Sequence, residues 1–258
     1  MLRKEINLEV MQVTEKIYIE NCDNMQLMAR YPDKYFSIVI TDVPYGLDVG
    51  NMAYLKETKT TVKQKNGTRI NGNKNKKVYT KKDWDLEPPS QQYFDEVKRI
   101  SKHQIIFGVE YVNWEGLGSG RIKWNKGFAE GMSFKPYEMA YCSFIDYVKE
   151  IDYLYAGMMQ GKSISEPMVQ QGNKKLNEKR EHPTQKPILL WDLILKFCIE
   201  NNIDISTILD TNSGLCSLGL SALKFEEVEE VVMCDIDEEY YEKAIKRVKN
   251  HVSQLKLF

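Results

Sequence analysis

The stretch that decides the fold is "ISTILDTNSGLCSLGLSALKF", Ile205 to Phe225. It opens with a β-branched, apolar run that ends at Asp210, continues through a turn of small residues, and closes with leucines at helical spacing. The following "VEEVVMCDIDEEYYEKAIKRVKNHV", Val228 to Val252, repeats the order of strand, acid and helix, with the strand ending at Asp235. Strands that alternate with helices are typical of a mostly parallel sheet with helices on both faces.

The same alternation extends toward the N-terminus. The segment "YFSIVITD", residues 35–42, predicts a strand that ends at Asp42, and "PILLWDLILKFCIE", residues 187–200, is apolar nearly all round, as a helix buried on several sides is. Further strands are expected at 15–22, 103–112, 120–127 and 137–144, the last near the sheet's edge, and further helices at 23–32 and 90–101. We expect residues 1–258 to form a single α/β domain with a Rossmann-like, mostly parallel twisted sheet.

Composition excludes several classes of protein. A net charge of −1 argues against a surface that attracts polyanions or membranes everywhere. The three histidines show no metal-ligand spacing, so no metal site is expected. The five cysteines form no CxxC pair, which is typical of a reducing compartment, and we expect a cytoplasmic protein. No apolar run approaches the roughly 18 residues of a membrane span, and no signal peptide is recognisable.

Three predicted strands end on an acid, namely Asp42, Asp210 and Asp235. In open α/β sheets ligands bind beyond the carboxyl ends of the strands, so these acids should converge on one rim. The alternative for any one of them is that it caps the helix that follows.

The turn after Asp210 indicates which ligand this rim accepts. Gly214 and its small neighbours let the backbone approach a ligand closely, and an acid placed like Asp235 can accept both hydroxyls of a ribose. The G-x-G-x-x-G spacing of dinucleotide sites is absent, because only Gly214 and Gly219 are present. A nucleoside without a pyrophosphate is therefore the favoured ligand.

The stretch "IVITDVPYGLD", Ile38 to Asp48, indicates chemistry at the other end of the rim. The Asp42 carboxylate and the carbonyl before Pro44 are two acceptors suited to the two hydrogens of an exocyclic amino group, and Tyr45 suits stacking on the ring that bears it. Accepting those hydrogens localises the nitrogen lone pair and directs it at an electrophile. Alkylation of an amine is the expected reaction.

These motifs together resemble the S-adenosylmethionine-dependent amino-methyltransferases of DNA, which act on adenine N6 or cytosine N4. The order resembles the circularly permuted type, in which the catalytic half precedes the cofactor half. Asp42-Val43-Pro44-Tyr45 is similar to the family's Asp-Pro-Pro-Tyr motif, and "HPTQKP", residues 182–187, matches a family motif letter for letter. The segments 208–223 and 234–248 resemble the cofactor loop and the ribose-binding strand with its helix. The resemblance covers nearly the whole chain.

The resemblance implies a role for each matching residue. Asp42 and the Val43 carbonyl, held by Pro44, would bind the target amino group, and Tyr45 would stack on a flipped base. The implied cofactor-binding residues are Asn21, Cys22, Thr184, Lys186, Asp210, Asn212, Gly214 and Asp235. Of these, Asp210 and Gly214 would line the methionine portion, Asp235 would bind the ribose, and Thr184 with Lys186 would flank the methionine carboxylate. Aspartate at the motif's head favours adenine as the target.

Four positions depart from the family pattern. Val43 stands for proline, Asn212 for an aromatic residue or histidine, Cys216 for glycine, and Asn21 for aspartate. A side chain at 216 is expected to crowd the cofactor unless the loop shifts. A weakly active or inactive DNA-binding subunit of a larger complex is therefore an alternative, as are a cytosine-N4 enzyme and an RNA methyltransferase. The partner would be DNA, with a homodimer or a second methyltransferase-type subunit possible.

Residues 50–82 form a basic segment without apolar periodicity, expected to be a mobile loop. Between Thr58 and Lys82 it holds nine Lys or Arg and no acid, and Lys63, Lys65, Arg69, Lys74, Lys76 and Lys77 are the expected phosphate contacts. The alternative is a merely solvated run of charge. The polar residues 158–181 form a loop-rich insertion, the candidate target-recognition region.

Neutralising Lys74, Lys76 and Lys77 to glutamine should flatten the salt dependence of DNA binding. Each lost phosphate contact lowers the slope of log K against log salt by about 0.9. Fluorescence anisotropy over a salt series measures the slope. Neutralising Lys243 and Lys246, which lie beside the acidic residues 226–242, is the matched control. An unchanged slope in the first variant would return those lysines to the solvated alternative.

Overall fold

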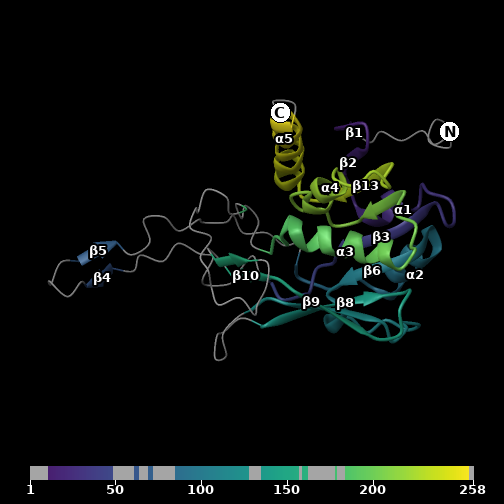
Figure 1. Cartoon of the computed structure of the whole chain (residues 1–258), viewed down its shortest axis with the longest axis horizontal. Coiled ribbons are helices and arrows are strands. Elements are labelled where there is room, and N and C mark those ends of the chain that lie inside the picture. The colour runs from purple at the N-terminus through teal and green to yellow at the C-terminus, as the bar shows by residue number, and fades with distance from the viewer. Residues whose placement is uncertain are drawn as a thin grey trace.

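The computed structural model describes residues 11–48, 61–63, 69–71, 85–127, 135–156, 159–161, 178 and 184–255. Within this part of the chain the elements from the N-terminus are β1 (Met11–Gln12), β2 (Ile17–Asn21), α1 (Asn24–Met28), β3 (Phe36–Asp42), β4 (Thr61–Lys63), β5 (Arg69–Asn71), α2 (Gln91–Ile100), β6 (Ser101–Phe107), the 3₁₀ turn η4 (Val109–Tyr111), β7 (Arg121–Asn125), β8 (Tyr137–Cys142), β9 (Val148–Asp152), β10 (Leu154–Ala156), β11 (Met159–Gly161), α3 (Ile188–Glu200), β12 (Thr207–Asp210), α4 (Ser217–Ala222), β13 (Glu230–Asp235) and α5 (Glu238–Leu255). Figure 1 shows their arrangement around one large sheet.

Nine of the described strands form this sheet, in the order β1-β2-β13-β12-β3-β6-β8-β7-β9. The five from β2 to β6 run parallel to one another. The late strands β12 and β13 lie between the early strands β2 and β3, so the end of β3 is a direct neighbour of the end of β12. β3 and β12 come from opposite halves of the chain, and their carboxyl ends therefore lie next to each other at the same end of the central strands.

One strand is placed differently from the sequence prediction. β8 lies between β6 and β7 and runs antiparallel to both, whereas the sequence placed residues 137–144 near the edge. The edge is occupied by β9, which pairs with β7 and which the sequence did not predict. Three of its five side chains are exposed and three are charged, as is common on edge strands.

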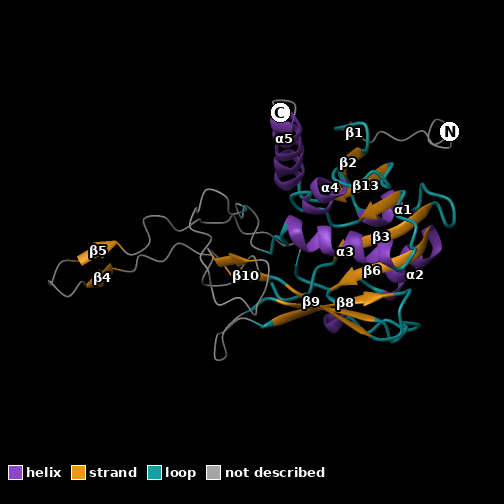
Figure 2. Ribbon diagram, in the orientation of Figure 1, coloured by secondary structure: helices purple, strands orange, loops and turns teal. Residues whose placement is uncertain are grey.

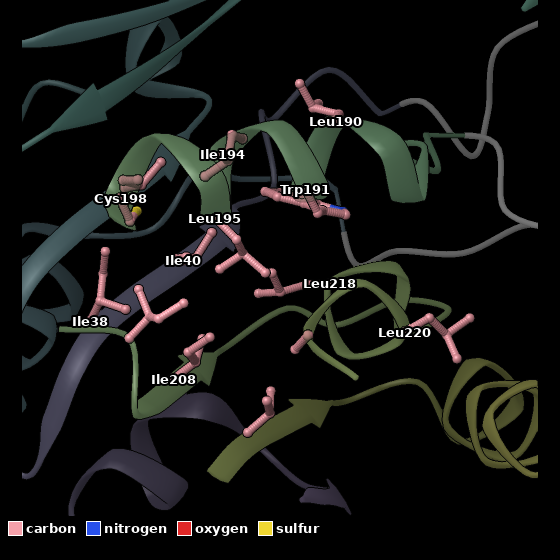
Figure 3. Packing of buried hydrophobic residues seen from close by; sticks show 14 of the residues in the cluster. Ile38, Ile40, Leu190, Trp191, Ile194, Leu195, Cys198, Ile208, Leu218 and Leu220 are labelled. Atoms are coloured by element: carbon pink, nitrogen blue, oxygen red, sulfur yellow. The ribbon is translucent and has the colours of Figure 1, made fainter. Parts of the chain in front are cut away.

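Helices cover both faces of the sheet, because successive side chains of each strand point to opposite sides. Ile38 and Ile40 of β3 pack in a buried cluster with α3, α4 and α5, whereas Val39 packs with α1 and α2. Figure 2 shows the helices on the two sides, and Figure 3 shows Leu195 of α3 close to Ile40. The expected Rossmann-like α/β fold with a mostly parallel sheet is confirmed, and α3 is buried on several sides as predicted.

The two insertions are described only in part. Within residues 50–82 the strands β4 and β5 pair antiparallel, so that part of the predicted loop is a short hairpin. Within 158–181, β11 pairs with β10 and Glu178 is described. The remaining residues of both segments lie outside the described ranges. Among the described helices none is long and apolar enough to cross a membrane.

The start of α4 is packed tightly. Cys216 precedes the helix in a left-handed conformation, with φ of 61°, and is fully buried. A Cβ on Gly219 would lie 2.6 Å from the Cys216 sulfur and 2.7 Å from Cε of Met233. Glycine at 219 therefore makes room for the thiol.

Gly219→Ala should destabilise the protein. Overpacking costs about 1–3 kcal/mol, which outweighs the roughly 1 kcal/mol that alanine gains in helix propensity. Urea denaturation measures the change in the free energy of unfolding. The same substitution made in a Cys216→Gly background should cost less, because the sulfur is gone. An equal penalty in both backgrounds would contradict the contact.

Candidate active site

The carboxyl ends of β3, β12 and β13 border a cavity of about 290 Å³. Asp42, Asp210 and Asp235 all line it, so the three strand-ending acids meet as the sequence indicated. Capping does not explain Asp42 or Asp210, because the N-cap of α2 is Ser90 and that of α4 is Cys216. Sequence-predicted residues that also line the cavity are Cys22, Val43, Pro44, Tyr45, Thr184, Lys186, Asn212 and Gly214.

The turn after β12 is tied to the end of β13. The Gly214 N–H donates to Oδ2 of Asp235 at 2.8 Å, and the Asp237 N–H donates to Oδ1 at 2.9 Å. Gly214 has φ of +50°, and a Cβ built on it would meet no atom within 4 Å. Its backbone therefore borders open space, which leaves room for the close approach of a ligand that the sequence predicts at this glycine.

Two departures from the family pattern have side chains that avoid the cavity. The Cys216 thiol is buried and lies 3.5 Å from the sulfur of Met233, so it packs in the core instead of crowding the turn. The Asn21 amide donates to the backbone oxygen of Asp235 at 2.8 Å, which links the ends of β2 and β13. Asn21 was a predicted cofactor ligand; here it supports the strand that carries Asp235.

Asp210 is almost fully buried, with 4% of its surface exposed. Its Oδ1 accepts hydrogen bonds from the Thr41 hydroxyl at 3.0 Å and from the Asn212 N–H at 3.1 Å. Burial raises the pKa of Asp210 to about 7; the two hydrogen bonds oppose this rise, and the nearby Asp42 and Asp235 add to it. At neutral pH this carboxyl is thus poised between its protonated and charged forms.

Asp42 belongs to a buried polar cluster that the sequence did not predict. The Tyr45 hydroxyl donates to Oδ1 of Asp42 at 2.8 Å, and the Lys186 ammonium forms an ion pair with the same oxygen. Lys186 also lies 3.0 Å from Oε2 of Glu138 on β8 and donates to the Tyr45 hydroxyl at 3.0 Å. The ammonium, predicted to flank a methionine carboxylate, here lies between two carboxylates of the protein.

The charges in this cluster compensate for burial. Burial raises the pKa of Asp42, and the adjacent Lys186 opposes the rise. Burial alone would also raise the pKa of Glu138, but Lys186 and Lys126 hold it at about 2. Burial lowers the pKa of Lys186, and the two carboxylates more than reverse that effect. The pair Asp42 and Glu138 thus keeps a charged lysine in a site where only 5% of its side chain is exposed.

Tyr45 is fixed from several sides. Its ring stacks on Tyr111 with centroids 4.7 Å apart and planes 13° apart. Its N–H donates to Asp85 at 2.7 Å. Behind it Gly108 has φ of +90°, and a Cβ there would lie 2.4 Å from the Tyr45 ring. Tyr111 therefore covers one face of the ring, the Lys186 ammonium lies 5.4 Å from the ring centroid, and Tyr45 is among the residues that line the cavity.

Arg247 of α5 is a further residue that the sequence analysis missed. It donates to the Leu215 carbonyl at 2.7 Å and to the Ser217 hydroxyl at 3.0 Å, and both of these residues line the cavity. It also pairs with Glu178 at 2.8 Å. Arg247 therefore connects the wall of the cavity to the one described residue of the candidate recognition insertion outside β11.

The predicted phosphate contacts lie only partly within the described residues. Lys63 and Arg69 lie in the hairpin strands β4 and β5, whereas Lys65, Lys74, Lys76 and Lys77 lie outside the described residues. In the described part of the chain no group of three or more His, Cys, Asp or Glu side chains is arranged to hold a metal ion.

A scan against models of protein families finds no match, and a search of curated proteins finds none either. Solved structures with a similar arrangement include the M1.HpyAVI–SAM complex, at 15% identity and a TM-score of 0.44, covering 90% of this chain and 99% of that one. They also include the PvuII DNA methyltransferase (cytosine-N4-specific), at 11% identity and a TM-score of 0.46, covering 94% of this chain and 93% of that one. Likeness at this level does not decide the function, which has to come from the site.

The pKa of Asp210 predicts a pH-dependent effect of Asp210→Asn. The folded protein keeps a proton on Asp210 up to about pH 7, whereas the unfolded chain releases it near pH 3.9. This contribution to stability is complete below pH 3.9 and is lost as the pH rises through 7. Between pH 5 and 8 the free energy of unfolding of the wild type should therefore fall, relative to the variant, by on the order of 2–3 kcal/mol. Urea denaturation at several pH values measures this difference, and a constant difference would contradict the assignment.

Proposed function

We propose that this protein is a DNA methyltransferase that uses S-adenosylmethionine and methylates the exocyclic N6 amino group of adenine. The observation that carries the proposal is that Asp42, with Tyr45 beside it, shares one cavity with Asp210 and Asp235. A carboxylate suited to bind an amine would thus lie beside acids suited to bind a nucleoside. The motifs that resemble DNA amino-methyltransferases supply the identity of the nucleoside and of the amine.

The cavity residues fit S-adenosylmethionine chemically. The bound group would supply an electrophilic methyl on a sulfonium centre. Asp235, which lines the cavity, would accept the ribose hydroxyls, and the open space beside Gly214 would admit a ligand close to the backbone. A cationic ligand would favour the charged form of Asp210, whose pKa lies near 7, so binding would release a proton there.

Asp42 is suited to hold and orient the amine. Its two described contacts, from Tyr45 and Lys186, both end on Oδ1, which leaves Oδ2 for a hydrogen of the substrate amino group. The Val43 carbonyl would accept the second hydrogen. With both hydrogens held, the lone pair would be localised on the nitrogen for direct in-line transfer. Oδ2 would then receive the proton that the methylated nitrogen must lose, helped by the burial that raises the pKa of Asp42.

The target base would have to leave the duplex to reach Asp42. Tyr45, which lines the cavity, would stack on the flipped base, and the stack with Tyr111 would hold its ring in place. The basic segment 50–82 is flanked by Asp48 and Asp85. The Asp48 N–H donates a hydrogen bond to the Asp85 carbonyl at 2.9 Å. Its lysines would therefore start from the rim of the catalytic cavity, where they would grip phosphates.

The second candidate is a noncatalytic DNA-binding subunit of the same fold. It is favoured by the ion pair that already occupies one oxygen of Asp42. Calorimetry with S-adenosylmethionine separates the two, because a subunit that has lost the chemistry need not keep the cofactor. If the wild type bound no cofactor even with DNA present, the second candidate would replace the first.

Expression in cells followed by sequencing that detects modified bases should show methylated adenine at defined sites. Asp42→Ala and the isosteric Asp42→Asn should reduce transfer by about a hundredfold or more, because alanine removes the acceptor of the amine hydrogen and asparagine removes the charge that takes up its proton. Their affinity for S-adenosylmethionine should stay within about threefold of the wild type, since Asp42 is assigned to the amine. A parallel loss of cofactor binding would overturn the role of Asp42, and modified cytosine in place of adenine would overturn the choice of base.

A further inference from the structure

Glu138 reaches the candidate active site from an antiparallel strand. It is the second residue of β8, the strand that runs antiparallel to its neighbours β6 and β7. The end of β6 pairs with the middle of β8, at Phe107 and Ala140, so the beginning of β8 extends past the carboxyl end of β6. An antiparallel strand thus places its first residues on the rim where the parallel strands place their last ones, next to Asp42.

Glu138 uses both carboxylate oxygens to organise the cluster around Asp42. Oε2 lies 3.0 Å from the Lys186 ammonium and 3.1 Å from the Tyr45 hydroxyl, the two groups that contact Oδ1 of Asp42. Oε1 pairs with Lys126 at 2.6 Å. The side chains of Glu138 and Lys186 are 17% and 5% exposed, so water screens these contacts only weakly.

Charge balance explains why a second carboxylate is needed. Lys186 faces two acids, and Lys126 supplies the second positive charge, so two carboxylates meet two ammonium groups. Without Glu138, Lys186 would have Asp42 as its only carboxylate among the described residues and would be drawn fully onto it. The ammonium would then compete with the substrate amine for Oδ2 of Asp42.

We propose that Glu138 is a positioning residue: by sharing Lys186, it holds the ammonium at Oδ1 of Asp42 and keeps Oδ2 directed at the substrate amine. This role rests on the proposed function of Asp42. The charged or titratable groups that face Asp42 are Lys186 from the segment before α3, Glu138 from β8, Tyr45 after β3 and Asp210 from β12. Lys126 acts through Glu138.

Glu138→Gln tests the role with little change of shape. The turnover number should fall by at least about tenfold, because Lys186 shifts toward Oδ2, while the affinity for S-adenosylmethionine stays within about threefold. Removing the negative charge of Glu138 also favours the charged form of Asp42, so the acidic limb of the pH profile of kcat should move to lower pH. Lys186→Met should move the same limb to higher pH.

Glu110→Gln is the matched control. Glu110 pairs with Lys135 and accepts from the Met139 N–H next to Glu138, yet it does not contact Asp42. It should leave the acidic limb in place. Circular dichroism and thermal melts check that each variant is folded. A fall in activity for Glu138→Gln with an unmoved limb, or one moved to higher pH, would overturn the proposal and leave Glu138 a structural residue.

A second readout separates this inference from the proposed function. With ¹³C-labelled aspartate, NMR titration follows the Asp42 carboxyl directly, with Asp42→Asn identifying its signal. Glu138→Gln should lower the pKa of Asp42 and Lys186→Met should raise it, whether or not the protein methylates DNA. Shifts in these directions together with no methyl transfer by the wild type would remove the proposed function but leave the control of Asp42 by Glu138. Absence of both shifts would remove the positioning role.

Discussion

The parallel pairing of β3 with β12 is the constraint on which the rest of the site depends. Ile208 lies opposite Ile38 and Leu209 opposite Val39, so two segments about 170 residues apart end side by side. The Thr41 hydroxyl donates to Asp210 across this pair, next to Asp42. The apolar residues of both strands are fully buried, and their burial supplies the free energy that holds acidic groups together at the rim. Without that pairing Asp42 and Asp210 would have no common cavity.

Gathering buried carboxylates at one rim has an electrostatic cost, and the protein meets it in two different ways. Asp210 has no described cationic partner, and burial raises its pKa to about 7, so it is readily neutralised by a proton. Asp42 instead keeps a permanent counter-ion, Lys186, which Glu138 shares. The arrangement at Asp210 suits a site that binds a cationic ligand. The arrangement at Asp42 suits a site that presents a charged oxygen.

Much of the fold and of the cavity lining could be predicted because both follow local rules. Apolar runs that end on an acid gave β3, β12 and β13, and the cavity contains Asp42, Asp210 and Asp235. The rule covers only parallel strands, which is why Glu138 was missed: it begins an antiparallel strand, and sequence alone does not reveal strand direction. β9 was missed because an edge strand with three charged residues in five lacks the apolar signal of a buried one. The contacts of Lys186 and Arg247 were missed because each joins residues far apart in the chain.

Cys216, which stands where the family pattern has glycine, shows why a single departure from such a pattern is weak evidence against function. Cys216 adopts the left-handed conformation that glycine favours, which costs of the order of 1 kcal/mol, yet its thiol points into the core against Met233. The space it needs comes from Gly219, where any side chain would collide with that sulfur. The turn at Gly214 consequently stays open toward the cavity. The shape of this cavity depends on where the backbone of the turn runs, and Gly219, three residues after Cys216, lets the backbone keep that course.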